Sequence, residues 1–495
     1  MKGIAIGLSN NSKEILKRLK KTEFVKDIYI AGSSKDNGKE NELIQVQKPR
    51  EILLKKWPEI DLIIFIGSIA ASIRIINSFL TSKDQDPGVI VIDNKCSKIV
   101  PLIGLHQSNT QNIACQIANL LGGEIIETNN SNDQSFLNLD AFGNQWGWKR
   151  SGNIKDWSKL VIKQAKNEEI FCKQLSGNSL WKTSESGEII NQINEKEIEK
   201  PDSTFHVSIF ENHETTWHPP VLWIGIGCER NTSKELIANS LNNFLESGNL
   251  SQQSIAGFAT IDIKKDEKGI LELAEEKNLP IKFFSKEDLS TIIVPNPSNV
   301  VQKEIGTPSV AEASCLLAAG EESKLLEEKR IFKNQSGAVT IAVAESKNQY
   351  NPTHGEIHII GSGPGDISFL TNNAKKALSR CTVWIGYKMY LDLIKSLKRS
   401  DQVLIESKLT EEKERCSKAI KLAEEGIKVA LISSGESGFY GMAGLLLELL
   451  QKIKKEYRPY FEVHPGISSV QLAAAISGAP LMNDFCSVSL SDKLT

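Results

Sequence analysis

Short apolar runs alternate with amphipathic stretches through most of the 495-residue chain. In its first part, runs with the length and composition of buried strands occur at Gly3–Leu8, Asp27–Ala31, Leu62–Ile66 and Val89–Asp93. Helical periodicity of the apolar residues occurs at Ser12–Lys21, Ala71–Leu80 and Ser108–Leu121. This alternation predicts an α/β protein made of several doubly wound domains with largely parallel sheets.

The alternation stops between about Glu127 and Pro201, where Asn, Ser and Gln dominate. A polar tract without aromatic residues would indicate a linker. Here, however, five of the eight tryptophans lie in this stretch or just beyond it: Trp146, Trp148, Trp157, Trp181 and Trp217. Large aromatic side chains favour burial, so the pattern predicts a small domain or a long insertion packed onto its neighbours.

Regular patterning returns with predicted strands at Val221–Gly227, Ala256–Ile263, Ile281–Phe284 and Val339–Ala344. Capping-box spacing at Thr232 and Glu235, and again at Ser309 and Glu312, predicts two helix starts. The polar stretch Lys347–Gly355, which contains Pro352, has the character of an exposed interdomain linker. We therefore expect domains at 1–126, 127–220 and 221–345, a linker at 346–355 and a last domain at 356–495.

The last domain has its own series of predicted strands, with helices between most of them. The strands are expected at Ile357–Ile360, Val383–Ile385, Val403–Ile405, Val429–Ile432, Phe461–Val463 and near Cys486–Leu490. Three of them are followed by loops rich in Gly and Ser, which read GSGPGD from Gly361, SSGESGFYG from Ser433 and HPGISS from His464. Because ligands gather at the carboxyl ends of parallel strands, we expect these loops to share one cleft.

Composition and charge narrow the class of protein. Hydrophobic residues make up 40% and charged residues 24% of the chain, and the net charge of −2 gives no overall basic surplus for a nucleic acid. The N-terminus lacks a signal-peptide core, and the longest nearly apolar run, Leu62–Ala71, is too short for a membrane helix. Eight scattered cysteines without a CxxC pair fit reduced thiols, so we expect a cytoplasmic protein that binds neither membranes nor nucleic acid.

One pair of histidines has a spacing close to that of a zinc-binding motif. His213 and His218 frame the sequence HETTWH, but a zincin helix needs its two histidines four residues apart. Here they are five apart, and Pro219 and Pro220 argue against a continuing helix. We interpret both histidines as structural and predict no metal site.

The first glycine loop has two readings from its residues alone, a ligand-binding turn or merely a tight turn. A nicotinamide-dependent reductase would require GxGxxG with a helix starting inside it, whereas Pro364 breaks that spacing. Ser468 or Ser469 could also serve only as the cap of the helix that follows. The occurrence of three such loops after three strands favours a shared site over coincidence.

The three loops together resemble the tetrapyrrole (precorrin) methylases, in particular precorrin-3B C(17)-methyltransferases. IGYKMYLDLI from Ile385 and the ending SLSDKLT support the resemblance, which covers about Glu356–Thr495. It implies two α/β domains with S-adenosylmethionine in the cleft between them. By the same resemblance, the cofactor contacts are Pro364, Ser434, Gly435, Glu436, Phe439, Ser468 and Ser469, with Gly363 and Gly365 as candidates for the substrate side.

The chain departs from this family at two points. The family's second loop usually contains Gly-Asp-Pro, where this chain has Gly435, Glu436 and Ser437. Glu keeps the charge, but the loss of Pro frees the turn. The sequence also ends where the family's second domain begins, so we expect either a fragment or a methylase that does not turn over as shown.

The upstream region resembles cobalt-precorrin-5A hydrolases over about Met1–Gly320. FIGSIAASIR from Phe65, DPGVIVID from Asp86 and PLIGLH from Pro101 match the N-terminal part of that family. IGIGCERNTS, ATID and GTPSVAE, which start at Ile224, Ala259 and Gly306, match its C-terminal domain. The implied chemistry is the opening of a lactone on a ring-contracted tetrapyrrole, with release of acetaldehyde.

A precorrin carries many carboxylates, so arginines near helix starts are candidate anion receptors. Arg230 and Arg74 are such candidates, each weighed against plain surface charge. His106 is a weak candidate base for lactone opening, because a lone histidine is more often structural. Cys228 is a weaker candidate nucleophile, since no neighbouring base is evident.

The sequence thus predicts a fused enzyme of cobalamin synthesis that uses S-adenosylmethionine and a tetrapyrrole substrate. Other enzymes of corrin synthesis are expected partners, and a homodimer is one expected assembly. The alternative is a non-catalytic protein that binds or channels tetrapyrroles and carries a degenerate methylase domain. The sequence leaves open whether the cobalt-early or the oxygen-dependent route is served.

Overall fold

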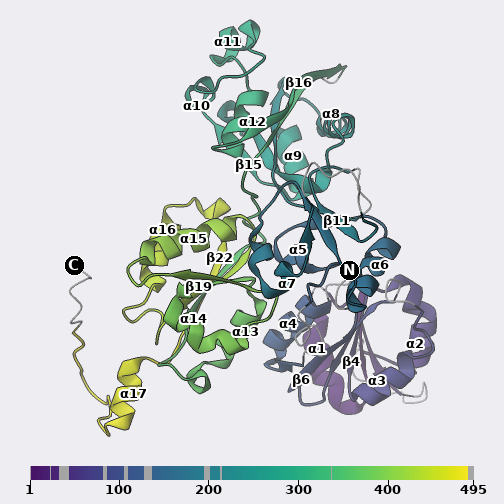
Figure 1. The fold of residues 1–495 in the computed structure, drawn as a ribbon. Helices are drawn as coiled ribbons and strands as arrows, with labels where there is room; N and C mark the ends of the chain where they lie inside the picture. The colour runs from purple at the N-terminus through teal and green to yellow at the C-terminus, as the bar shows by residue number, and fades with distance from the viewer. Residues whose placement is uncertain are drawn as a thin grey trace. The chain divides into compact units, whose positions relative to one another are not determined.

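The computed structural model describes residues 2–22, 24–32, 44–81, 86–104, 110–126, 136–193, 201–211, 215–335 and 337–488. The chain divides into two compact units, Met1–Asn130 and Ser131–Thr495 (Figure 1). The described residues form four sheets, one in the first unit and three in the second. Within these ranges, no helix is both long enough and apolar enough to cross a membrane.

The first unit is a seven-stranded sheet in the order β3-β2-β1-β4-β5-β6-β7, with helices on both faces. Its strands are β1 (Gly3–Gly7), β2 (Asp27–Ala31), β3 (Ile44–Gln47), β4 (Leu62–Ile66), β5 (Gly88–Ile92), β6 (Lys98–Ile103) and β7 (Glu124–Ile125). Its helices are α1 (Lys13–Lys20), α2 (Pro49–Lys56), α3 (Ile69–Ile76) and α4 (Thr110–Leu121). The neighbouring strands are parallel except β5 and β6, which run antiparallel.

The sequence of β4 explains this layering. All five of its residues, LIIFI, are buried, and their side chains alternate between the two faces of the sheet. Leu62, Ile64 and Ile66 join the core under α1 and α4, whereas Ile63 and Phe65 join the core under α2 and α3. A continuous apolar run is therefore what a central parallel strand requires, and the predicted doubly wound α/β class is confirmed.

The Asn-rich middle stretch forms a five-stranded sheet in the order β10-β9-β11-β12-β8. Its strands are β8 (Lys149–Ser151), β9 (Phe171–Gln174), β10 (Asn191–Gln192), β11 (Thr204–Val207) and β12 (Thr216–His218), and its helices are α5 (Phe142–Gln145), α6 (Ile154–Ala165) and α7 (Glu185–Glu188). All five tryptophans are buried, each at most 2% exposed. The ring of Phe142 packs against three of them, with its centre 5.2 to 5.8 Å from those of Trp148, Trp181 and Trp217. Aromatic packing thus replaces the aliphatic periodicity that the sequence lacks.

The third sheet has the order β15-β14-β13-β17-β16, with β17 antiparallel to both of its neighbours. Its strands are β13 (Leu222–Cys228), β14 (Ile255–Ile261), β15 (Ile281–Phe284), β16 (Lys324–Asn334) and β17 (Gly337–Glu345). Its helices are α8 (Lys234–Ser247), α9 (Lys268–Lys277), α10 (Lys286–Ser290), α11 (Asn299–Ile305) and α12 (Ala311–Ala319).

Both predicted capping boxes of this region are wrong in detail. The cap of α8 is Ser233, whose hydroxyl accepts from the Leu236 N–H at 3.2 Å. The hydroxyl of Thr232 donates instead to the carbonyl of Glu229. Before α12, Val310 occupies the cap position without a side-chain hydrogen bond. The spacing therefore located each helix start to within two residues but not the capping side chain.

The last sheet is entirely parallel, in the order β20-β19-β21-β18-β22. Its strands are β18 (Glu356–Gly361), β19 (Val383–Tyr387), β20 (Val403–Ser407), β21 (Lys428–Ser433) and β22 (Tyr460–His464). Its helices are α13 (Asn372–Arg380), α14 (Lys388–Ile394), α15 (Glu412–Glu424), α16 (Ala443–Gln451) and α17 (Ser469–Ile476). Helices α13 and α14 cover one face and α15 and α16 the other (Figure 1). The second face shares one apolar cluster with the tryptophan-rich sheet.

Two local expectations fail in this unit. The stretch 347–355 is not an exposed linker, because the side chain of Gln349 is buried and donates to the carbonyls of Trp146, at 2.6 Å, and Glu425, at 2.8 Å. The Gln349 side-chain oxygen also accepts from the Trp148 indole. The predicted strand near Cys486–Leu490 is absent over 486–488, and its other residues lie outside the described ranges.

Candidate functional site

Three glycine loops meet at the carboxyl edge of the last sheet. Strand β18 lies between β21 and β22, and all three run parallel. The loops that follow them, at 361–366, 433–441 and 464–469, therefore emerge side by side at one edge. This is the arrangement that the sequence predicted for a shared cleft.

The first two loops are joined by their backbones at Gly363 and Gly435. Each residue donates its N–H to the carbonyl of the other, at 3.1 Å and 3.0 Å, in an isolated antiparallel bridge. Their φ angles are +75° and +60°, in the left-handed region that favours glycine. The two glycines are thus needed for the conformation of the loops themselves.

The third loop touches the other two at Gly466. A Cβ atom on Gly466 would lie 2.1 Å from the carbonyl oxygen of Gly435 and 2.6 Å from that of Gly361. Both obstacles are backbone atoms, so they cannot be moved by a change of rotamer. We call this meeting of Gly361, Gly435 and Gly466 the glycine junction.

The side of the loops away from the glycine junction is open. No atom of the described residues lies within 4 Å of the position that a Cβ on Gly365 would take, and Ser434 is exposed. The ring of Phe439 is 39% exposed and packs edge-on against Tyr440. Pro364, in the first loop, is half-buried. An exposed backbone and an aromatic ring at a sheet edge can hold a flat heterocyclic ligand.

The carboxylate of Glu436 accepts hydrogen bonds from its own loop. One oxygen accepts from the Gly438 N–H at 2.8 Å, and the other accepts from the Ser437 hydroxyl at 3.4 Å. These bonds restrain the turn that lacks the family's proline. Glu436 therefore shapes the loop, and its carboxylate is only partly available to a ligand.

The two serines of the third loop lie at the start of α17. Ser468 forms a complete capping box, in which its hydroxyl accepts from the Gln471 N–H and the Gln471 side chain accepts from the Ser468 N–H. Ser469 is the exposed first residue of the helix. The capping interpretation of Ser468 is thus what the geometry shows.

Two features of this edge were not singled out from the sequence. The hydroxyl of Ser362 is buried and has no hydrogen-bond partner among the described residues, which is costly unless a ligand or water supplies one. A cavity of about 710 Å³ lies at the carboxyl ends of β19 and β20, where its lining includes Tyr387, Met389 and Ser407. Both lie at the same edge of the sheet as the loops, because all its strands are parallel.

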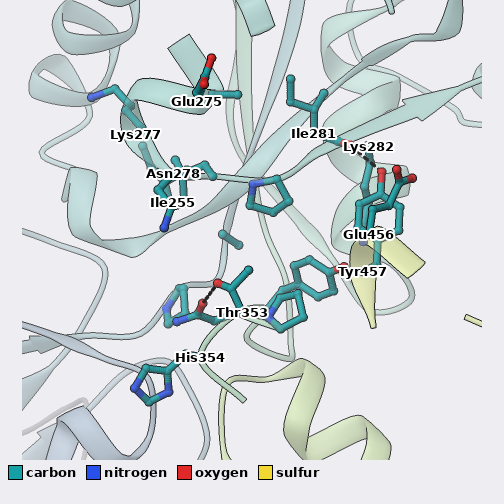
Figure 2. Close-up of a pocket in the computed structure, with 18 of the residues that line it drawn as sticks. Ile255, Glu275, Lys277, Asn278, Ile281, Lys282, Thr353, His354, Glu456 and Tyr457 are labelled. Carbon is teal, nitrogen blue, oxygen red and sulfur yellow. Dashed lines mark hydrogen bonds between the residues drawn. The ribbon is translucent and has the colours of Figure 1, made fainter. Parts of the chain in front are cut away.

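A larger cavity, of 1160 Å³, lies elsewhere in the second unit (Figure 2). It is lined by parts of the third sheet, by the stretch 350–354 and by Lys454, Glu456 and Tyr457. The Tyr457 hydroxyl donates to the carbonyl of Ile281 at 2.8 Å. Five lysines and two glutamates contribute to the lining: Lys149, Lys265, Lys277, Lys282, Lys454, Glu275 and Glu456. The surplus of lysines suits a ligand with several carboxylates.

Lys282 is the most constrained of these lysines. Burial lowers the pKa of Lys282 to about 8, while the charge of Glu424 acts in the opposite direction. Its ammonium lies 4.1 Å from the ring centre of Trp223 and 4.5 Å from that of Tyr350, contacts that favour the charged form. Figure 2 shows Lys282 beside Glu456 and Tyr457.

The remaining candidates lie away from the glycine loops. The Arg230 guanidinium is paired with Asp266 at 2.6 Å and donates to the carbonyl of Ile263, which favours a surface ion pair over a carboxylate receptor. Arg74 is exposed on α3 in the first unit. His106 lies outside the described residues.

The chemical roles considered for Cys228 and His218 find no support. Burial raises the pKa of Cys228 to about 11, so its thiol stays protonated near neutral pH. His218 is buried in β12, where its ring nitrogens bond the Ser151 hydroxyl at 2.7 Å and the Ser208 carbonyl at 2.9 Å. This fits the structural reading of His218, while its neighbour His213 lies outside the described residues.

Comparison with known families assigns most of the chain to three family models. Residues 51–132 match the N-terminal domain of cobalamin synthesis G, and 222–344 match the C-terminus of the same family. Residues 356–495, which carry the glycine junction, match the tetrapyrrole (corrin/porphyrin) methylases. The chain thus combines two regions that match the cobalamin synthesis G family with a region that matches the tetrapyrrole methylases.

Curated relatives divide in the same way. A cobalt-precorrin-5A hydrolase from Priestia megaterium is 27% identical over 357 residues, which cover 68% of this chain and 93% of the relative. A cobalt-factor III methyltransferase from the same organism is 46% identical over 28% of this chain and 26% of its own length. A probable cobalt-factor III C(17)-methyltransferase from Salmonella typhimurium is 46% identical over 28% of this chain and 56% of its own length. The chain thus spans between about a quarter and about half of these two methyltransferases.

Proposed function

We propose that this cobalamin-synthesis fusion carries two activities on tetrapyrroles. The methylase domain transfers a methyl group from S-adenosylmethionine to C(17) of a precorrin-3B-type macrocycle, with ring contraction. The cobalamin synthesis G region opens the lactone of a cobalt-precorrin-5A-type product and releases acetaldehyde. The observation that carries the first activity is the glycine junction within residues 356–495, where three loops present their backbones at one sheet edge.

The loops fit S-adenosylmethionine in shape and in unsatisfied polarity. The open face beside Gly365 admits a ligand against the backbone, and the buried Ser362 hydroxyl lacks a partner in the part of the chain that the structure describes. In this proposal Gly363, Pro364 and Gly365 line one side of the cofactor. Ser434, Gly435, Glu436 and Phe439 line another, and Ser468 and Ser469 form the end of the site. When bound, the cofactor supplies an electrophilic methyl group on a sulfonium.

In this proposal the protein promotes methyl transfer by positioning the macrocycle and the cofactor. Attack by an electron-rich ring carbon on a sulfonium needs the two centres in line and close, and it needs little acid–base help. The cavity at the ends of β19 and β20 offers a place for the macrocycle beside the cofactor loops. This accounts for a site built from backbone and small residues.

We assign the hydrolase-like region to residues 1–126, 127–220 and 221–345, joined through 346–355 to the methylase domain at 356–495. The family matches at 51–132, 222–344 and 356–495 support this division. Tetrapyrroles are the substrates under this proposal, other enzymes of corrin synthesis are its partners, and the assembly is a homodimer.

A second candidate function is the holding or channelling of tetrapyrroles. The lysine-rich cavity of Figure 2 favours it, because residues of the hydrolase-like C-terminal sheet and of the methylase domain line the same space. Its 1160 Å³ suffices for a ligand larger than most drug-sized molecules.

The test supplies the chain with each substrate separately. With methyl-labelled S-adenosylmethionine and precorrin-3B or cobalt-factor III, label should appear on the macrocycle once the second methylase domain that the family resemblance implies is also supplied. With cobalt-precorrin-5A, acetaldehyde should be released at a rate proportional to the chain. Gly435→Val should stop the first reaction and leave the second unchanged, since Gly435 is not part of the apolar cluster that the methylase sheet shares with the tryptophan-rich sheet. Absence of both products, together with tetrapyrrole binding, would support the channelling function instead.

A further inference from the structure

Two histidines and a glutamate come together on neighbouring strands of the methylase domain. His358 lies on β18, and Glu462 and His464 lie on β22, with His358 directly opposite Glu462 in the parallel register. The Nδ1 atom of His358 is 2.9 Å from Nε2 of His464. One carboxylate oxygen of Glu462 lies 3.9 Å from the first nitrogen and 3.8 Å from the second.

A second carboxylate fixes the orientation of the His358 ring. Nε2 of His358 lies 2.9 Å from Glu356, whose carboxylate is itself held by Lys428 at 2.5 Å and by Arg380 at 3.4 Å. A carboxylate oxygen accepts hydrogen bonds, so the contact with Glu356 makes Nε2 of His358 the donor. Nδ1 of His358 is then left with a lone pair that points at His464. A carboxylate behind a histidine is the usual support of a metal-binding imidazole.

The separations are those of a coordination site. They define a point that lies about 2.1 Å from all three atoms, which is the length of a Zn–N bond and within the range for Zn–O. Two imidazoles and one carboxylate form a donor set that suits Zn²⁺ and other first-row divalent ions better than Mg²⁺ or Ca²⁺. His358 and His464 are buried, whereas Glu462 is 47% exposed and leaves a path from solvent.

We propose that His358, Glu462 and His464 bind one first-row divalent transition-metal ion, with Glu356 as the acceptor that orients His358. The fourth position faces the exposed side of Glu462 and takes water. His464 stands two residues before Gly466, so the ion ties β22 and the third loop to β18 at the base of the glycine junction. The site therefore stabilises the edge strand β22, which positions the third glycine loop.

The experiment titrates Zn²⁺ into the full chain, prepared without a histidine tag and stripped with a chelator. We expect one ion to bind per chain, measured by calorimetry, and Co²⁺ to bind at the same place with the visible absorption of a low-coordinate site. His464→Gln and Glu462→Gln should each weaken binding at least tenfold. Glu356→Gln should weaken it about 10- to 100-fold without removing a ligand.

The variants keep the result interpretable. Glu462 is half-exposed, so its amide variant should fold, which circular dichroism checks. Glu448→Gln, an exposed change on α16 outside the cluster, is the matched control and should bind Zn²⁺ like the parent chain. Failure of the parent chain to bind Zn²⁺ would overturn the proposal. So would unchanged affinity and an unchanged Co²⁺ spectrum in both ligand variants.

Discussion

Replacement of Gly466 by alanine tests the glycine junction with the smallest possible change. The added methyl group would lie 2.1 Å from the Gly435 oxygen and 2.6 Å from the Gly361 oxygen. An unstrained carbon–oxygen contact is about 3.3–3.6 Å, so the third loop must move away from the other two by about 1 Å. The variant should therefore open the junction without changing the charge or polarity of the site.

The expected cost follows from two contributions. Overpacking of a tight contact destabilises by about 1–3 kcal/mol. The two backbone hydrogen bonds between Gly363 and Gly435 would be strained, and a hydrogen bond contributes about 1 kcal/mol. We expect the local free energy of opening to fall by about 2–4 kcal/mol in Gly466→Ala. Affinity for S-adenosylmethionine should fall at least about tenfold, which corresponds to 1.4 kcal/mol.

Hydrogen exchange read by mass spectrometry is the assay, because it reports each region of a multidomain chain separately. Peptides that contain Gly363 and Gly435 should exchange faster in Gly466→Ala, while peptides from the third sheet should not change. Gly444→Ala is the control, since a Cβ there meets no atom within 4 Å and alanine favours α16. Equal protection and equal cofactor affinity in Gly466→Ala and Gly444→Ala would refute the junction.

Four further outcomes are expected. Gly435→Val should abolish binding of S-adenosylmethionine in equilibrium dialysis, because a φ of +60° strains valine and changes the loop. Circular dichroism should stay unchanged, because no neighbour lies closer than 3.7 Å to the added Cβ. Binding of parental strength would show that the loop is only a turn. Lys282→Met should raise the thermal unfolding midpoint at pH 7, because the pKa of Lys282 is lowered to about 8, and the advantage should shrink as pH rises from about 8 to 10.5; a lower midpoint at pH 7 would contradict this. In Glu356, burial raises the pKa, but hydrogen bonds from its cationic and histidine neighbours outweigh it and lower the pKa to about 2. Denaturant titrations of Glu356→Gln should therefore show a loss of about 1–2 kcal/mol at pH 7, after allowance for solvent screening, and this difference should vanish as pH falls from about 4.5 to 2; a pH-independent difference would exclude the ion pair as its cause. Limited proteolysis should spare the connecting stretch around the buried Gln349, and early cleavage there would contradict its packing.

Buried parallel strands were the part of the fold that the sequence predicted best. Runs such as LIIFI at Leu62–Ile66 are apolar on both faces, and only a central strand between two helix layers buries both. Strand β3 at Ile44–Gln47 was missed because its run is short and polar, as suits a sheet edge. The tryptophan-rich sheet was foreseen as packed, but its strands were not, since aromatic cores leave no simple period.

The connecting stretch 347–355 shows where prediction from neighbouring residues in the sequence fails. Gln349 is polar, and nothing near it in the sequence indicates burial. Its amide is buried because the carbonyls of Trp146 and Glu425 and the indole of Trp148 lie around it, and these come from distant parts of the chain. Tertiary hydrogen bonds of this kind are invisible to composition.

The sequence predicted that the three glycine loops lie at one edge of the sheet, as they do. It did not separate the residues that shape the loops from those available to a ligand. Gly363 and Gly435 were both predicted to belong to these loops. Their positive φ angles explain why glycine occupies the two positions. The hydrogen bonds of Glu436 to its own loop could not be foreseen. The pairing of His358 with His464 did leave a signal, because polar residues alternate on two strands expected to be parallel, at 356 and 358 and at 462 and 464.

The central claim is that the loops around the glycine junction hold S-adenosylmethionine. Calorimetric titration of the full chain with S-adenosylmethionine and, separately, with NADH tests it most directly. The account predicts one S-adenosylmethionine site per chain, no heat with NADH, and binding that is at least about tenfold weaker in Gly466→Ala but unchanged in Gly444→Ala. Binding of NADH, or S-adenosylmethionine binding of equal strength in both alanine variants, would contradict it.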